Sequence, residues 1–132
     1  MKTRILMSLS ALFTGAVGIV LSFLPQETLV TLGAAPGPAL VVLVQVAGGA
    51  YLGFAFLDWM ARGVLIGGIY SRPLALGNFL HFAIVAVTLL KAMTAIDSAL
   101  VYGLAAIYSV FAAWFGLVLF TSPIAARRDE NG

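Results

Sequence analysis

Four long apolar stretches constrain this chain more than any other feature of its sequence. They cover about residues 5–24, 39–60, 73–90 and 99–120, and each comes close to the roughly 20 residues that a helix needs to cross a bilayer. The first stretch ends before Pro25 and the fourth before Pro123. The first is longer than the apolar core of a signal peptide, so we expect it to be retained. The pattern predicts an all-α integral membrane protein.

Composition supports a bilayer as the natural solvent. Of the 132 residues, 62% are hydrophobic and 9% are charged, whereas an ordinary soluble domain carries about 25% charged residues. A soluble protein of this size could not cover its surface with so few charges. The net charge of +2 does not indicate nucleic acid as a partner, because the basic residues flank the apolar stretches instead of forming a patch.

The residue inventory also limits the chemistry. The chain has no Cys, which excludes disulfides, thiolate metal sites and thiol catalysis. His81 is the only histidine, so one chain cannot supply a site with two histidine ligands. No nucleophile with an adjacent base is visible. We therefore expect no catalytic residue, no metal site and no cofactor.

Lys and Arg are distributed unevenly between the two sides of this topology. If the N-terminus is cytoplasmic, only Lys91 lies on the opposite side. The cytoplasmic side then holds the other six basic residues, which are Lys2, Arg4, Arg62, Arg72, Arg127 and Arg128. This positive-inside bias predicts a multi-pass protein of the bacterial inner membrane with both termini in the cytoplasm and residues 121–132 as a short tail.

Small residues at helical spacing predict how the helices pack. Lipid offers no hydrophobic drive, so helices associate through close contact between small residues and through hydrogen bonds. The expected contact residues are Gly15 and Gly18 in the first stretch, Gly49 and Gly53 in the second, and Ser109 and Gly116 in the fourth. Gln45 is expected to bond to another helix or to a partner chain. Short connections predict one up-down-up-down four-helix transmembrane bundle over residues 1–132.

A second face of the fourth stretch is large and aromatic. It carries Leu104, Tyr108, Phe111 and Phe115 at helical spacing. We expect this face to meet lipid or a partner subunit. Membrane lipid, together with either further copies of the chain in a homo-oligomer or a larger membrane complex, is the expected set of partners.

Three polar residues lie inside predicted spans, where polar groups are costly and are candidates for function. Asp58 is about one turn from the end of the second span, and Asn78 lies at the same level in the third, so a contact between them is expected. His81 lies about one turn deeper. An interhelical hydrogen bond is the favoured interpretation of His81, because no second carboxylate lies at its depth, and a titrating or ligand-binding group is the alternative.

Other polar residues surround Asp58 in the sequence. Arg62 follows it at i+4, so the two side chains can pair, and Tyr51 lies seven residues earlier on nearly the same helix face. Arg72 follows Tyr70 in a Gly-rich turn and can bind the phosphate of a lipid. We define the predicted polar cluster, on the cytoplasmic side between the second and third spans, as Asp58, Tyr51, Tyr70, Arg72, Asn78 and His81.

The block "DWMARGVLIGGIYSRPLALGNFLHF" resembles a motif of small, uncharacterised four-span bacterial membrane proteins. That motif has an Asp or Asn before Trp, a GGIY-x-RP turn and an Asn-x-x-His pair. The resemblance covers mainly the second and third spans and brings no activity. It implies that the family's distinctive positions are Asp58, Trp59, Tyr70, Arg72, Pro73, Asn78 and His81. The plan is weakly similar to DoxX-like proteins, whose acidic signature in the third span is missing here.

Three functions are compatible with these residues. The preferred one is a non-catalytic membrane protein that serves as a subunit, assembly factor or lipid-binding partner of an inner-membrane complex. The alternative is an oligomeric transporter of a small molecule or ion that uses Asp58 or His81. An enzyme that modifies lipid or quinone comes last, because Asp58 and His81 alone would have to supply its acid–base chemistry.

Overall fold

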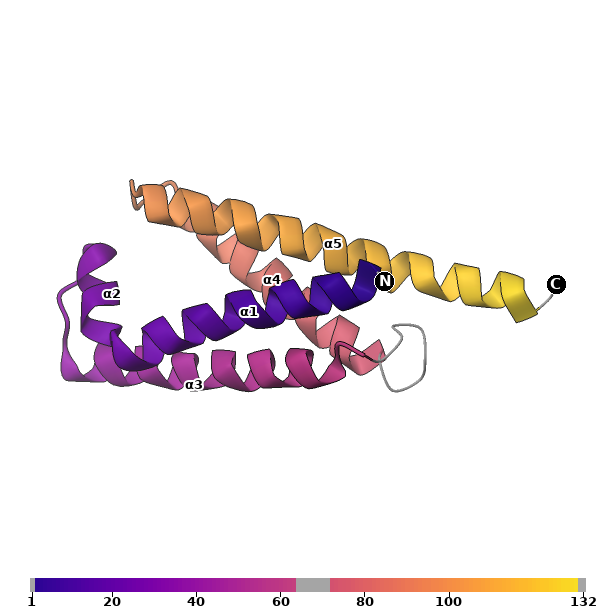
Figure 1. Ribbon diagram of the computed structural model, residues 1–132. Helices are drawn as coiled ribbons and strands as arrows, with labels where there is room; N and C mark the ends of the chain where they lie inside the picture. Colours follow the sequence, from indigo (N-terminus) through magenta and orange to yellow (C-terminus); the bar gives the residue numbers. More distant parts are fainter. Residues whose placement is uncertain (1, 64–71, 131–132) are drawn as a thin grey trace. The chain divides into compact units, whose positions relative to one another are not determined.

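The computed structural model describes residues 2–63 and 72–130, and these residues form five helices and no strand (Figure 1). The helices are α1 (Lys2–Phe23), α2 (Pro25–Thr31), α3 (Pro38–Ala61), α4 (Arg72–Ala92) and α5 (Ala99–Glu130). The all-α class expected from the sequence is confirmed.

Four of the helices in the described chain are long and apolar enough to cross a membrane. Their apolar segments are Thr3–Phe23, Pro38–Ala61, Arg72–Ala92 and Ala99–Thr121, with 21 to 24 residues each. At about 1.5 Å per residue these segments are roughly 32–36 Å long. That length matches a hydrocarbon core of roughly 30 Å. The chain is therefore a multi-pass membrane protein, as its sequence predicted.

The loop predicted between the first two spans contains the short helix α2. Pro25 is its first residue, where a missing N–H has no helical partner to lose. Glu27 lies in the first turn, where its negative charge meets the positive end of the helix dipole. Leu29 is buried, so α2 is held by packing as well as by local preference. Gly33 then turns the chain with a φ of 81°, which glycine adopts without strain.

The last helix continues past Pro123, where the sequence predicted its end. α5 extends to Glu130, so the tail predicted for residues 121–132 is helical through most of its length. A proline removes one backbone hydrogen bond, but residues on either side can remain helical. The Ala and Arg residues at positions 125–128 have high helix propensity and favour this continuation.

Contacts between helices divide the chain into two compact units. One unit is Met7–Arg62, which holds most of α1 together with α2 and α3. The other combines the first turn of α1 with α4 and α5. The single transmembrane domain expected over residues 1–132 stays a prediction.

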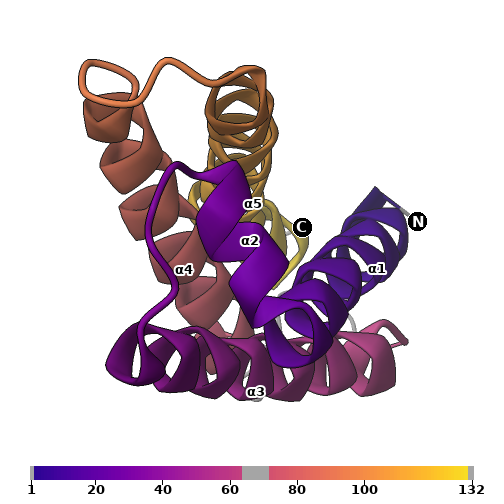
Figure 2. The ribbon, with the colours of Figure 1, turned by 90° about the vertical axis from the view of Figure 1, so that its left-hand side faces the viewer.

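In the first unit, α1 and α3 run antiparallel and touch through glycines. A Cβ on Gly18 would lie 2.9 Å from the backbone N of Leu52, and a Cβ on Gly48 would lie 2.7 Å from the backbone N of Ser22. Glycine lets the two backbones approach this closely. Over the part of α1 that belongs to this unit, Figures 1 and 2 show the helix diverging from α3 toward its N-terminal end. Gln45 Nε2 donates to the Ser22 carbonyl O at 3.3 Å, which confirms its predicted bond to another helix.

The glycines expected on this contact occupy two different settings. A Cβ on Gly15 would meet the Cβ of Ala55 at 3.5 Å, an ordinary contact across the α1–α3 interface. A Cβ on Gly49 or Gly53 would meet nothing within 4 Å among the described residues. The glycine of α3 that meets α1 is Gly48. Adjacent helical residues point about 100° apart, so a shift of one position changes the face.

In the second unit, an aromatic core joins α4 to α5. The ring of Phe82 lies 4.8 Å from that of Phe111, 5.5 Å from Tyr108 and 5.6 Å from Phe115, measured between centroids. Phe82 and Phe115 are completely buried, and Tyr108 is 2% exposed. The prediction that this face of α5 meets lipid or a partner is therefore wrong for Tyr108 and Phe115. Stacked rings bury large areas and attract one another, which favours a ring-to-ring contact between α4 and α5.

The small residues expected on α5 lie near this aromatic core. Gly116 is buried, and a Cβ there would lie 3.1 Å from the ring of Phe79. Phe79 in turn meets Phe120 edge to face at 5.9 Å between centroids. Ser109 is half-buried and donates its hydroxyl to the Ala105 carbonyl O of its own helix at 2.7 Å. The α4–α5 contact therefore combines a small residue with large rings.

Candidate functional site

Asp58 is an acidic side chain with no exposed surface in the first unit. α3 carries it about one turn before the helix ends at Ala61. Ser10 on α1 is also completely buried and donates its hydroxyl to Asp58 Oδ2. A polar group without a donor or acceptor in an apolar medium is costly. The hydrogen bond lowers that cost and joins α1 to α3 at the end where the two helices spread apart.

Thr14 extends this polar row along α1. It is completely buried, and its Oγ1 donates to the Ser10 carbonyl O at 2.7 Å. Sequence reasoning missed both hydroxyl residues, because Ser and Thr in membrane helices commonly bond only to their own backbone. The available signal was their i, i+4 spacing on an antiparallel helix, at the depth of Asp58.

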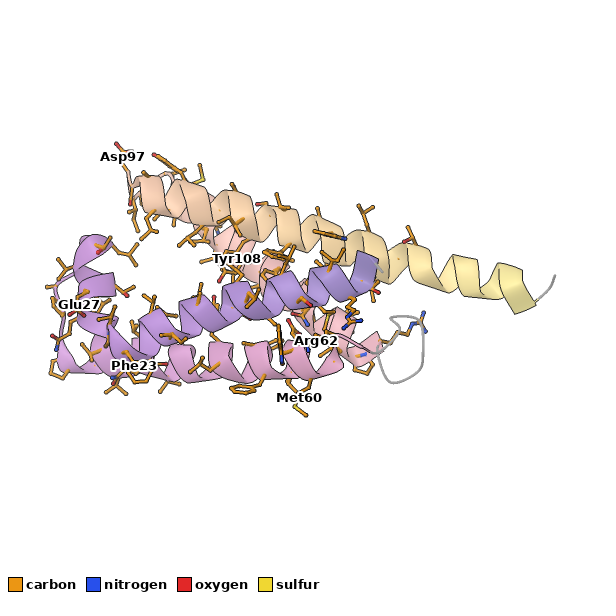
Figure 3. The ribbon with its side chains drawn as sticks, viewed as in Figure 1. Phe23, Glu27, Met60, Arg62, Asp97 and Tyr108 are labelled. Carbon is orange, nitrogen blue, oxygen red and sulfur yellow. The ribbon has the colours of Figure 1, made fainter. Side chains whose placement is uncertain are left out.

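Arg62 is the C-cap residue of α3, and its side chain lies on the ring of Trp59. Its guanidinium carbon lies 3.5 Å from the ring centroid of Trp59. Nη1 of Arg62 is buried and has no hydrogen-bond acceptor among the described residues. Attraction between a cation and an aromatic ring, worth about 0.5–2 kcal/mol, favours this stacked position. Figure 3 shows Arg62 at the end of α3.

An open apolar groove lies along the same pair of helices, and its volume is about 280 Å³. We define the α1–α3 groove by its lining residues, which are Ala11, Leu12, Gly15, Ile19, Leu52, Ala55, Phe56 and Trp59. Three of them are small, and the others are large and apolar or aromatic. The volume lies just below the roughly 300–1,000 Å³ range of small-ligand pockets. The lining suits an apolar occupant.

In the second unit, Asn78 and His81 lie on successive turns of α4. Asn78 is completely buried, and its Nδ2 donates to the Leu74 carbonyl O at 3.1 Å. His81 is half-buried, with its ring centroid 5.1 Å from that of Phe82 and 6.0 Å from that of Tyr108. His81 therefore borders the aromatic core of α4 and α5.

The remaining members of the predicted polar cluster belong to different units or lie outside the described residues. Tyr51 is half-buried on α3, and Arg72 is exposed at the start of α4. Tyr70 lies outside the described residues. Asp58 belongs with Tyr51 to the first unit, whereas the rest of the described cluster belongs to the second. The expected contact between Asp58 and Asn78 joins two units and stays a prediction.

The described side chains and the groove can support binding and proton exchange. Among the described residues, no group of three or more His, Cys, Asp or Glu side chains could hold a metal ion. The Ser10–Asp58 bond can join two helices or exchange a proton, and the α1–α3 groove can hold an apolar chain. Comparisons with protein-family models, curated proteins and solved structures give no match to this chain.

Proposed function

We propose that this chain is a non-catalytic protein of the bacterial inner membrane that works by binding, as a subunit, assembly factor or lipid-binding partner of a larger complex. The α1–α3 groove is the observation that supports this proposal. It is apolar, it opens on the side of a membrane-spanning hairpin, and Gly15 leaves room where a larger residue would fill it.

The hairpin holds the two walls of the groove in place before an occupant arrives. At one end the backbones of α1 and α3 touch at Gly18 and Gly48. At the other end Ser10 and Asp58 form a buried hydrogen bond. Binding to a preorganised surface avoids part of the entropy loss that would otherwise oppose association.

Purification in mild detergent followed by native mass spectrometry tests this function. We expect a particle heavier than one chain, with bound lipid or a second protein. Gly15→Leu should reduce that extra mass, because a Cβ at position 15 fits and the longer side chain enters the groove. Gly49→Leu is the matched control, because it adds the same side chain where α1 and α3 do not meet. A bare monomer from the unaltered chain would contradict the proposal.

A second candidate function is transport of a small molecule or ion, and the buried Asp58 favours it. A carboxyl inside a membrane span can bind and release a proton if the protein alternates between states. Flux into vesicles should then be lost in Asp58→Asn and reduced in His81→Ala. Flux at the unaltered rate in both variants would exclude this mechanism.

A further inference from the structure

Arg62 gives the α1–α3 groove a charged end. The guanidinium lies on the Trp59 ring, and Trp59 itself lines the groove. Nη1 is buried without an acceptor among the described residues, so the cation has hydrogen-bonding capacity that those residues leave unused. An apolar groove with a cation at one end matches the shape and polarity of one phospholipid acyl chain and its phosphate.

We propose that the α1–α3 groove binds an anionic phospholipid, with an acyl chain along the groove and the phosphate on Arg62. This inference rests on the proposed function, because it names the occupant of the same groove. Arginine presents N–H donors in a planar fork that fits phosphate oxygens. Basic residues at the cytoplasmic rim of a membrane attract anionic headgroups.

The groove has the direction and lining that an acyl chain needs. Its α1 residues extend from Ala11 to Ile19, which at about 1.5 Å per residue is roughly 12 Å along a membrane-spanning helix. Lipid chains lie along the same direction in a bilayer. Ala11, Gly15 and Ala55 keep the groove open, while Phe56 and Trp59 add large apolar surfaces beside it. The end toward Trp59 is the end that carries Arg62.

The position of Arg62 favours lipid over a second copy of this chain. It lies at the C-terminal end of α3, which is the level of the headgroups if α3 spans the bilayer. A phosphate is present at that level in every leaflet of phospholipid. A partner helix in the groove would instead need an acidic residue at that level to satisfy Arg62.

Trp59 provides a direct measurement, because bromine atoms on a lipid chain quench tryptophan fluorescence only at contact. The chain has two tryptophans, so Trp114→Phe leaves Trp59 as the sole reporter. The variant is reconstituted in phosphatidylcholine vesicles with a small, equal fraction of dibrominated phosphatidylglycerol or dibrominated phosphatidylcholine. We expect brominated phosphatidylglycerol to occupy the site about fivefold more readily, the preference that one basic residue at an anionic surface supplies.

Substitutions separate the two parts of the proposed site. Arg62→Gln should bring the ratio between the two brominated lipids to one, whereas Arg4→Gln, the same change at an exposed arginine near the start of α1, should leave it unchanged. Gly15→Leu should weaken quenching by both lipids, and Gly49→Leu should not. Circular dichroism checks that each variant is helical. The Arg62→Gln result stands alone if Gly15→Leu does not fold.

Four outcomes would overturn the proposal. Equal quenching by both lipids in the chain with Arg62 removes the phosphate site, and loss of the preference in Arg4→Gln places that site elsewhere. A protein partner or a second copy that is released by Gly15→Leu replaces lipid as the occupant but leaves the proposed function intact. A bare monomer whose Trp59 is not quenched would contradict both the lipid site and the proposed function.

Discussion

Asp58 illustrates how one buried polar side chain is accommodated in an apolar hairpin. Its Oδ2 accepts from Ser10, and Thr14 donates to the Ser10 backbone one turn away. All three side chains are completely buried. A hydrogen bond between membrane helices contributes about 0.6–2 kcal/mol, so its contribution is modest but directional. The bond fixes the register of α1 against α3 at the end of the hairpin that lies away from the Gly18–Gly48 contact.

Ser10→Ala should destabilise the hairpin by about 1 kcal/mol, because Asp58 loses a donor in an apolar setting. Asp58→Asn should be milder, since its amide oxygen can still accept from Ser10. Unfolding in detergent micelles, measured for Ser10→Ala, Asp58→Ala and the double variant, gives the coupling between the two positions, because each of these changes removes the bond. Ser8→Ala on the same helix is the control, because Ser8 is only half-buried. Additive effects of the two changes would show that the bond contributes no stability.

Phe82 lies at the centre of the contact between α4 and α5. Its removal should destabilise the protein more than the loss of the Ser10–Asp58 bond. Phe82→Ala leaves a cavity among Phe111, Phe115 and Tyr108, with an expected loss of about 3–5 kcal/mol. Phe120→Ala is the control, because Phe120 is 66% exposed. Thermal unfolding followed by circular dichroism measures both. Equal losses in the two variants would argue against the aromatic core.

At the scale of elements, the two hairpins pack by different means. α1 and α3 meet where glycines let their backbones touch, with Gly18 opposite Gly48. α4 and α5 meet through rings, with Phe82 at the centre. In lipid, where no hydrophobic effect drives helices together, either close backbone contact or aromatic stacking can stabilise a helix pair. The first arrangement leaves an open groove beside the contact, and that groove is the site proposed for binding.

Gly48 and Gly49 are neighbours that should respond in opposite ways to the same substitution. Gly48→Ala forces the backbones of α3 and α1 apart, because the new Cβ would lie 2.7 Å from the Ser22 backbone N. The expected loss is about 1–3 kcal/mol, as for other overpacked interfaces. Gly49→Ala meets nothing within 4 Å among the described residues, so its higher helix propensity should leave stability unchanged or raise it by up to about 1 kcal/mol. Thermal unfolding of the two variants measures the difference. A larger loss in Gly49→Ala would contradict the α1–α3 contact.

At the scale of the whole molecule, the distribution of charge predicts the orientation of the chain in the membrane. Six of the seven basic residues lie on one side of the four-span topology, and only Lys91 lies on the other. This bias predicts that α2 and the loop at residues 93–98 face outward and that both termini face the cytoplasm. The same orientation places Arg62 at the inner leaflet, where anionic headgroups are available.

The absence of Cys makes this orientation directly measurable. Single cysteines at the exposed positions Gln26 and Thr94 should react with a membrane-impermeant maleimide in cells whose inner membrane is intact. A cysteine at the exposed Gly63 should react only after the inner membrane is permeabilised. These three substitutions leave every basic residue in place. Labelling of Gly63→Cys from outside would reverse the predicted topology.

The sequence by itself determined the solvent of this protein, its helical class and its spans. Those properties depend on the sum of transfer free energies along each stretch, which is independent of the neighbouring helix. The exact ends of the helices were harder to predict from the sequence, since α5 continues past Pro123 and α2 forms where a loop was expected. Local preferences at helix ends are weak, and packing or favourable flanking residues override them.

Only the tertiary structure decided which faces pair. The sequence predicted that Gly49 meets α1, but the residue in contact is Gly48. It also predicted that the aromatic face of α5 meets lipid or a partner, whereas Tyr108 and Phe115 on that face pack on α4. It also gave Asp58 no partner on α1, although Ser10 donates to it. The physical reason is that a helix contact depends on complementarity between two surfaces. One helix in isolation carries several faces that are equally able to pack.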